Sequence, residues 1–112
     1  MSLKTKRIGS AIAREISIIL HEEARNEILK NVGITDVTVD SDLTFAKVYF
    51  MTRLDDKAMV EKELNEAAGF IRRELAKSLN LRSTPELRFV YDKSLDYSKK
   101  IDEIIEDIKE GE

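Results

Sequence analysis

Residues 55–79, DDKAMVEKELNEAAGFIRRELAKSL, carry the pattern that decides the fold. Apolar side chains recur at helical spacing before and after Gly69, which interrupts the series. A glycine within a helix costs about 1 kcal/mol relative to alanine, so its presence here predicts a kink or a close backbone approach. We therefore expect two helices that meet at Ala67, Ala68 and Gly69, with Asp55 as the N-cap of the first.

Strand-like segments lie on both sides of this helical stretch. Residues 35–40 and 46–52 alternate apolar with polar side chains, and the segment between them is rich in turn-forming residues, so the pair predicts a β-hairpin. Residues 86–91 alternate in the same way after the single proline, Pro85, and predict a third strand. The sequence leaves open which strand pairs with the third one.

Two more amphipathic patterns flank these elements. Residues 4–26 place Ile12, Ile16 and other apolar side chains three or four positions apart and predict a first helix. Residues 95–110 predict an amphipathic C-terminal helix whose polar faces are dense in Asp and Glu. The order helix, strand, strand, helix, helix, strand, helix predicts one α+β domain over residues 1–112, with helices covering one face of a three-stranded sheet.

The composition excludes several classes of function. The 112 residues include no Cys, which excludes disulfides, thiolate nucleophiles and cysteine zinc sites, and a single His, which offers no pair for a metal. Four scattered Gly cannot form a phosphate-binding loop, and no apolar run approaches the roughly 18 residues of a membrane span. We therefore expect a monomeric, cytoplasmic binding protein without catalytic residues, metal, cofactor or membrane contact. A small hydrolase stays open only because carboxylates are numerous.

The net charge of −3 hides an uneven distribution along the chain. Residues 1–25 carry five basic and three acidic side chains and residues 70–91 carry five and two, whereas the other segments are acidic. Since the local field guides partner choice more than the total charge does, these segments predict a basic face for nucleic acid, with a solvated helix face as the alternative. About five phosphate contacts would give log affinity against log salt a slope of about −3.5 to −4.5. The candidate cations are Lys4, Lys6, Arg7, Arg14, Lys47, Arg72, Arg73, Lys77 and Arg82.

Four blocks of the sequence resemble one known family. They are RIGSAIAREIS (7–17), DLTFAKVY (42–49), NEAAGFIR (65–72) and LRSTPELRF (81–89). In this order and spacing they look like ribosome-binding factor A, and the resemblance covers about residues 6–105. It implies a KH-type domain of the bacterial kind, type II, in which an Ala-x-Gly kink replaces the usual Gly-x-x-Gly loop that clamps the nucleic-acid backbone. Ala67, Ala68 and Gly69 match that kink and join the candidate RNA-binding residues.

The resemblance implies a function as well. It implies a non-catalytic assembly factor that binds the immature small (30S) ribosomal subunit, assists 16S rRNA processing and maturation, and matters for growth in the cold. The implied partners are 16S rRNA, free 30S subunits or their precursors, and a ribosome-associated GTPase that promotes release. Two features depart from the family pattern. Residues 25–28 lack the Asp-Pro-Arg turn of many members, and residues 102–107 are acidic where some relatives continue into a basic tail.

A different class of function stays open on the residues alone. In that interpretation the chain is a protein-interaction module, and the acidic helix expected over residues 95–110 docks on a basic partner without any contact to RNA. Co-sedimentation with free small subunits at low salt discriminates between the two hypotheses.

Overall fold

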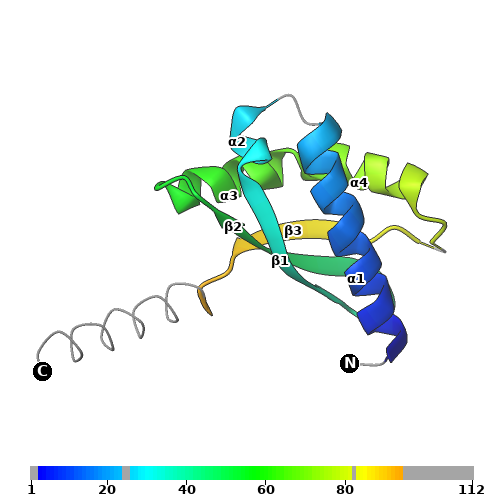
Figure 1. Cartoon of the computed structure of the whole chain (residues 1–112). Helices are drawn as coiled ribbons and strands as arrows, with labels where there is room; N and C mark the ends of the chain where they lie inside the picture. Colours follow the sequence, from blue (N-terminus) through cyan, green and yellow to red (C-terminus); the bar gives the residue numbers. More distant parts are fainter. Residues whose placement is uncertain (1–2, 24–25, 82, 95–112) are drawn as a thin grey trace, which may run out of the picture.

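The predicted helices and strands up to residue 91 follow one another in the predicted order, with a short additional helix between the first helix and the first strand that was not predicted (Figure 1). The computed structural model describes residues 3–23, 26–81 and 83–94, and the statements below concern those residues. The elements are α1 (Leu3–Ile18), a π-helical segment η1 (Ile19–Glu23), α2 (Glu27–Lys30), β1 (Val32–Val39), β2 (Phe45–Thr52), α3 (Lys57–Glu66), α4 (Ala68–Ser78) and β3 (Glu86–Tyr91). The α+β architecture is confirmed, whereas the helix predicted over residues 95–110 lies outside the described residues.

The first predicted helix ends before residue 26. Its α-helical part stops at Ile18, and in the π-helical segment that follows, the adjacent side chains Ile19 and Leu20 are both buried. Both continue the three- and four-residue spacing from the buried Ile16, which places them on the side of the helix that faces the core. Asn26 then caps α2, because its side chain accepts a hydrogen bond from the Ile28 N–H at 2.9 Å.

The kink between the two central helices is confirmed. Ala67 lies between α3 and α4, and its carbonyl accepts a hydrogen bond from the Ile71 N–H at 3.0 Å. The predicted N-cap is wrong by one residue, because Asp56 rather than Asp55 precedes α3. The Asp56 carboxylate accepts a hydrogen bond from the Met59 N–H at 3.0 Å, and this bond satisfies one of the free donors of the first helical turn.

The sheet has the strand order β1-β2-β3. β1 and β2 form the predicted antiparallel hairpin, with a register shift between Ile34 and Asp36. β3 pairs with β2 in parallel, which identifies the strand partner that the sequence left open. A parallel pair needs a crossover connection from one end of the sheet to the other, and α3 with α4 provides it.

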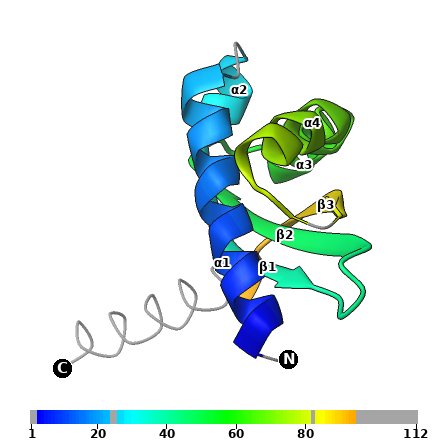
Figure 2. The ribbon, with the colours of Figure 1, turned by 90° about the vertical axis from the view of Figure 1, so that its right-hand side faces the viewer.

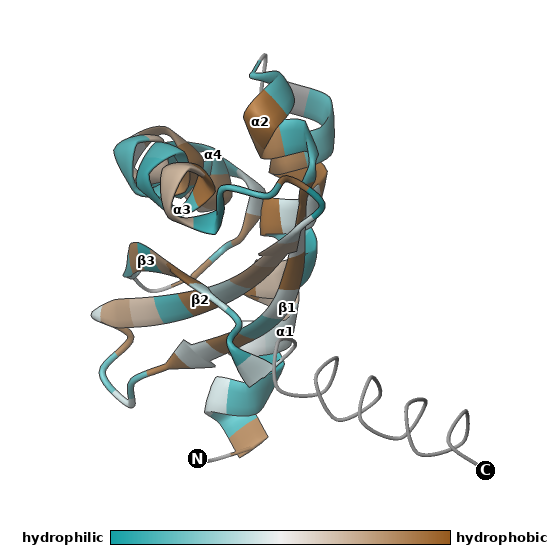
Figure 3. Ribbon diagram, turned by 90° about the vertical axis from the view of Figure 1, so that its left-hand side faces the viewer, coloured by the Kyte–Doolittle hydropathy of each residue, from teal (hydrophilic) through white to brown (hydrophobic). Residues whose placement is uncertain are grey.

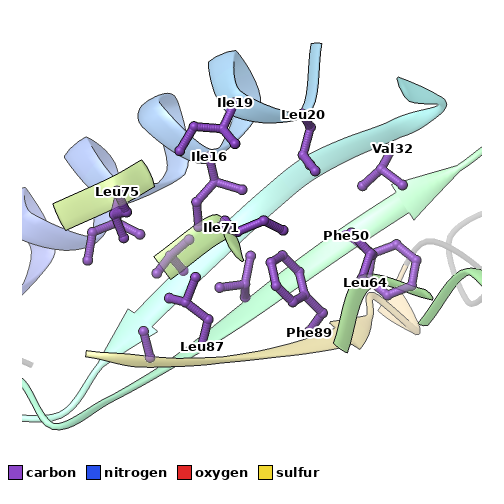
Figure 4. Close-up of a cluster of buried hydrophobic side chains, with 14 of the residues drawn as sticks. Ile16, Ile19, Leu20, Val32, Phe50, Leu64, Ile71, Leu75, Leu87 and Phe89 are labelled. Atoms are coloured by element: carbon purple, nitrogen blue, oxygen red, sulfur yellow. The ribbon is translucent and has the colours of Figure 1, made fainter. Parts of the chain in front are cut away.

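The core lies between the helices and one face of the sheet. Figures 2 and 3 show α1 on one flank of the molecule, with α3 and α4 next to it above the strands. In the close-up of Figure 4, Ile71 and Leu75 of α4 lie together with Ile16 of α1 and with Phe50 and Phe89 of the strands, and all five are almost completely buried. Full burial of such a side chain stabilises a fold by about 1.5–3 kcal/mol, so this cluster fixes the positions of α1 and α4.

Both edges of the sheet are in contact with a helix. On the β3 edge, the side-chain amide of Asn65 in α3 donates to the Phe89 carbonyl at 3.0 Å and accepts from the Phe89 N–H at 2.9 Å. On the β1 edge, α1 approaches so closely that a Cβ added at Gly9 would lie 2.8 Å from the Val37 carbonyl oxygen. These contacts leave less of each edge open to pairing with another chain.

Candidate nucleic-acid interface

Three cations of α1 line one shallow depression. Lys6, Arg7 and Arg14 surround it together with Ser10 and Ala11, and its volume is about 520 Å³. They are exposed because the apolar stripe of α1 faces the core. No carboxylate in the described part of the chain lies within 4.0 Å of the three cations, so each of them can meet a phosphate.

A basic strip runs along α4. Gly69, Arg73 and Lys77 are exposed and follow one another at four-residue steps, so they share one side of the helix. A Cβ added at Gly69 would meet no atom within 4 Å, so packing does not require a glycine there. The Lys77 ammonium lies 3.2 Å from the Glu74 carboxylate, which partly neutralises it. Arg73 is the cation of this strip that has no carboxylate partner within the described ranges.

Arg72 is engaged within the protein. Its Nε and Nη2 atoms donate hydrogen bonds to the Thr84 carbonyl oxygen at 3.2 and 2.9 Å. This pair of bonds ties α4 to the segment that leads into β3, beside the buried Pro85. We interpret Arg72 as a residue that positions this segment, with the remaining guanidinium N–H groups left for a ligand. Arg82, also predicted to touch RNA, lies outside the described residues.

Two predicted cations lie away from the α1 depression and from the α4 strip. Lys47 projects from β2 on the face of the sheet opposite the helices, because its neighbours Ala46 and Val48 are buried on the inner face. Its ammonium lies 5.6 Å from the centre of the Tyr49 ring, a cation–π contact. Lys4 is exposed beside a separate depression of about 700 Å³ between α1, the hairpin turn and the segment after α4. The structure therefore does not join Lys47 to the cations of α1 and α4.

The kink exposes its glycine rather than its alanines. Ala67 and Ala68 are partly buried and pack against the core, whereas Gly69 is exposed. Of the three kink residues, Gly69 is thus the one that a ligand can approach directly. The absence of a side chain there would let a nucleic-acid backbone come closer to the helix than any other residue would allow.

A close approach between backbones occurs at Gly9, which the sequence interpretation did not single out. Gly9 lies on the apolar stripe of α1 together with Thr5 and Ile12, and all three are buried. A glycine within such a buried stripe is the sequence signal for the contact, because any larger side chain would separate the helix from the strand. The close approach considered for Gly69 involves no protein atom.

The Asp40 carboxylate in the hairpin serves the backbone of the turn. It accepts hydrogen bonds from the Thr44 N–H at 2.8 Å, the Thr44 hydroxyl at 3.0 Å and the Phe45 N–H at 3.2 Å. Desolvation acts to raise the pKa of Asp40, but the hydrogen bonds outweigh it and hold the pKa below the ordinary value of 3.8. Among the described residues there is no group of three or more His, Cys, Asp or Glu able to hold a metal. No helix within those ranges is long and apolar enough to cross a membrane.

Comparisons with known proteins agree with the resemblance in the sequence. The family model of ribosome-binding factor A matches residues 4–105. The ribosome-binding factor A of Legionella pneumophila is 38% identical over 106 residues, which cover 94% of this chain and 86% of that protein. The corresponding protein of Streptococcus mutans is 38% identical over 109 residues, which cover 95% of this chain and 94% of that protein. The similarity therefore extends over most of this chain and most of each relative.

Solved structures show the same fold at lower identity. The crystal structure of ribosome-binding factor A from Thermus thermophilus has a TM-score of 0.70 at 16% identity and covers 78% of this chain and 94% of that chain. The solution structure of a ribosome-binding factor A candidate from Thermotoga maritima has a TM-score of 0.64 at 24% identity, with 80% and 88% covered. A Thermus thermophilus ribosome-binding factor A model fitted into the cryo-EM map of a 30S complex has a TM-score of 0.67 at 16% identity, with 80% and 96% covered. The predicted KH-type fold is confirmed by these likenesses.

Proposed function

The chain belongs to the ribosome-binding factor A family, and from this premise we propose that it binds the small ribosomal subunit by placing cations of α1 and α4 on 16S rRNA phosphates. The depression on α1 carries the proposal, because Lys6, Arg7 and Arg14 gather there without a carboxylate partner in the described part of the chain. The Thermus thermophilus protein fitted into a 30S complex supports the identity of the partner.

Binding of this kind is electrostatic and needs no chemical step. Arg7 and Arg14 lie seven residues apart, a distance of about 10 Å along the helix, so the two guanidinium groups can reach separate phosphates. Each cation that neutralises a phosphate releases counterions from the RNA, and this release makes the affinity fall with salt. The affinity would then depend on the shape and backbone of the rRNA more than on its bases.

The number of free cations sets the expected salt dependence. Lys6, Arg7, Arg14 and Arg73 have no carboxylate within 4.0 Å among the described residues, whereas Lys77 is paired with an acid. Four phosphate contacts give log affinity against log salt a slope of about −2.8 to −3.6. This is shallower than the slope expected from five contacts, because a paired ammonium gains less from a phosphate.

Neutralisation of the α1 cations tests the proposal. In Arg7→Gln/Arg14→Gln the affinity for free 30S subunits should fall, and the salt slope should become shallower by about 1.4–1.8, because two phosphate contacts are lost. The matched control is Lys30→Gln/Lys62→Gln, which changes the charge equally on α2 and α3 and should leave the slope unchanged. Sedimentation with 30S subunits over a series of salt concentrations provides the measurement. A double variant that melts like the wild type and keeps the wild-type slope would refute the assignment of α1.

The exposed glycine of the kink receives a separate test. Gly69→Ala keeps the fold, because the added Cβ meets open space and the glycine has no positive φ. A lower affinity of this stably folded variant for 30S subunits would indicate that the RNA backbone approaches the kink. Full affinity would remove Gly69 from the interface and leave the cations of α1 as its basis.

The proposal includes the biological role that the resemblance implies. The protein would assist 16S rRNA processing, support growth in the cold and leave the subunit with the help of a ribosome-associated GTPase. A strain without its own ribosome-binding factor A, supplied with either the wild-type chain or Arg7→Gln/Arg14→Gln, tests this role. Only the wild-type chain should restore growth at low temperature and mature 16S rRNA ends. Equal rescue by both chains would show that this biological role does not depend on Arg7 and Arg14.

A further inference from the structure

The face of the sheet opposite the helices carries apolar and charged side chains side by side. We call it the open sheet face, and its members on β2 and β3 are Phe45, Lys47, Tyr49, Met51, Glu86, Arg88 and Val90. Phe45 is 39% exposed and Met51 is 43% exposed, which makes them two of the four exposed large apolar residues within the described ranges. They lie near opposite ends of β2, with the half-buried Tyr49 between them on the same face, so apolar surface extends along the strand.

Two cations of this face are direct neighbours. Lys47 of β2 and Arg88 of β3 are partners in the parallel register. Like charges in opposed positions destabilise a sheet, and no described carboxylate lies within 4.0 Å of either one. An anion placed between them would remove the repulsion. The part of the open sheet face around Lys47 and Arg88 therefore suits a partner that is both apolar and acidic, although Glu86 adds one negative charge at the start of β3.

The chain leaves β3 on the side of the open sheet face. Tyr91 packs inward against Phe50, with 5.7 Å between the ring centroids, so strand alternation directs the next residue, Asp92, outward. The Thr35 hydroxyl of β1 donates a hydrogen bond to the Asp92 carboxylate at 2.7 Å. Because β2 lies between β1 and β3, this bond draws the chain after β3 across the end of the sheet.

The residues that follow this exit match the open sheet face in chemistry and in length. Residues 92–112 carry eight acidic and four basic side chains. A helix over residues 95–108 would span about 21 Å, close to the roughly 26 Å of the eight-residue strand β2. Four isoleucines of this segment recur at helical spacing, and they are Ile101, Ile104, Ile105 and Ile108.

We propose that residues 95–112 dock on the open sheet face of their own chain, with the isoleucines on its apolar side chains and the carboxylates beside Lys47 and Arg88. The contact would cover apolar surface, neutralise the cation pair and exclude RNA phosphates from this face. It would leave the cations of α1 and α4 accessible, so the inference stands independently of the proposed function.

A paramagnetic label tests the contact in the full chain. The natural sequence has no Cys, so Lys109→Cys provides a single attachment point for a nitroxide. At low salt the label should strongly broaden the amide NMR signals of β2 and β3, and it should leave those of α4 sharp. The charge reversal Lys47→Glu/Arg88→Glu should abolish the broadening, whereas the matched reversal Lys30→Glu/Lys62→Glu should retain it. High salt should weaken it, because exposed charges are screened.

The same experiment distinguishes the other occupants of the face. Sharp β2 and β3 signals in the labelled wild-type chain would overturn the proposal and leave the face open to rRNA. Broadening that arises only when isotope-labelled chains are mixed with separate nitroxide-labelled chains would assign the face to a second copy, which also overturns it. Broadening within one chain that persists after the Lys47→Glu/Arg88→Glu reversal would contradict the role given to the cation pair.

Discussion

Replacement of Gly9 by alanine should destabilise the protein, although alanine is the better helix former. The added Cβ would lie 2.8 Å from the Val37 carbonyl oxygen and 3.8 Å from a methyl group of Val39. The first atom belongs to the backbone, so rotation of a side chain cannot relieve the clash. Either α1 or β1 must shift, and both are held by a close-packed core.

The expected loss follows from two opposing effects. Overpacking of a well-packed contact costs about 1–3 kcal/mol, and the gain in helix propensity returns about 1 kcal/mol, so Gly9→Ala should lose up to about 2 kcal/mol of unfolding free energy. Gly69→Ala is the matched control, since its Cβ meets no atom within 4 Å, and it should gain about 0.4–1 kcal/mol. At roughly 4 °C per kcal/mol, the melting temperatures of the two variants should differ by several degrees.

Thermal melting by circular dichroism and urea denaturation measure the difference. Both variants carry the same change in composition, so the comparison removes the general effect of alanine on the unfolded chain. If Gly9→Ala were as stable as Gly69→Ala, the close approach of α1 to β1 would not limit the side chain at residue 9. The account of how α1 is placed against the sheet would then be wrong.

Three further substitutions probe contacts that support the fold and the interface. Asn65→Ala removes both hydrogen bonds to the Phe89 backbone and should lower the unfolding free energy, measured by urea denaturation, by about 1–3 kcal/mol. An unchanged unfolding free energy would argue against protection of the β3 edge by Asn65. Arg72→Lys cannot form the paired hydrogen bonds to the Thr84 carbonyl and should lose about 0.5–1.5 kcal/mol of unfolding free energy. Equal melting temperatures of the variant and the wild type would contradict the positioning role of Arg72. The pKa of Asp40 is lowered in the folded state, so its stabilisation is complete above the ordinary value of 3.8 and is lost as pH falls through the folded value. Asp40→Asn should therefore flatten the fall in stability below about pH 4, and an unaltered acid profile would assign that fall to other carboxylates.

Local sequence patterns were sufficient to predict those helices and strands that have a clear hydrophobic period of their own. The break between α3 and α4, which lies at Ala67, was predicted from the nearby Gly69 in a helical series, without knowledge of any distant residue. The partner of β3 could not be predicted, because parallel pairing depends on where α3 and α4 carry the chain. The π-helical segment after Ile18 was missed because Ile19 and Leu20 continue the spacing of the first helix, so the sequence shows no sign of a change in helical period.

The residues of the candidate site also fall into two groups, those that could be placed from the sequence and those that could not. The alternation of Ala46, Lys47 and Val48 already assigns Lys47 to the side of the strand opposite the helices, so its separation from the α1 cations could have been derived from the sequence. The engagement of Arg72 could not, because the Thr84 carbonyl is twelve residues away and outside any helix or strand. Predicted site residues on periodic elements can thus be placed from sequence, whereas those that contact loops require the structure.

A count of basic residues therefore overestimates the phosphate contacts that a surface can make. An arginine that already donates to a carbonyl, or a lysine beside a carboxylate, gains less from RNA because its present partner must be replaced. Arg72 and Lys77 are in this position, whereas Lys6, Arg7 and Arg14 have no described carboxylate within 4.0 Å. The shallower salt slope expected for four contacts follows from this difference. A measured slope shallower than about −3.5, the shallowest value for five contacts, would show that engaged cations stay with their partners when the RNA binds.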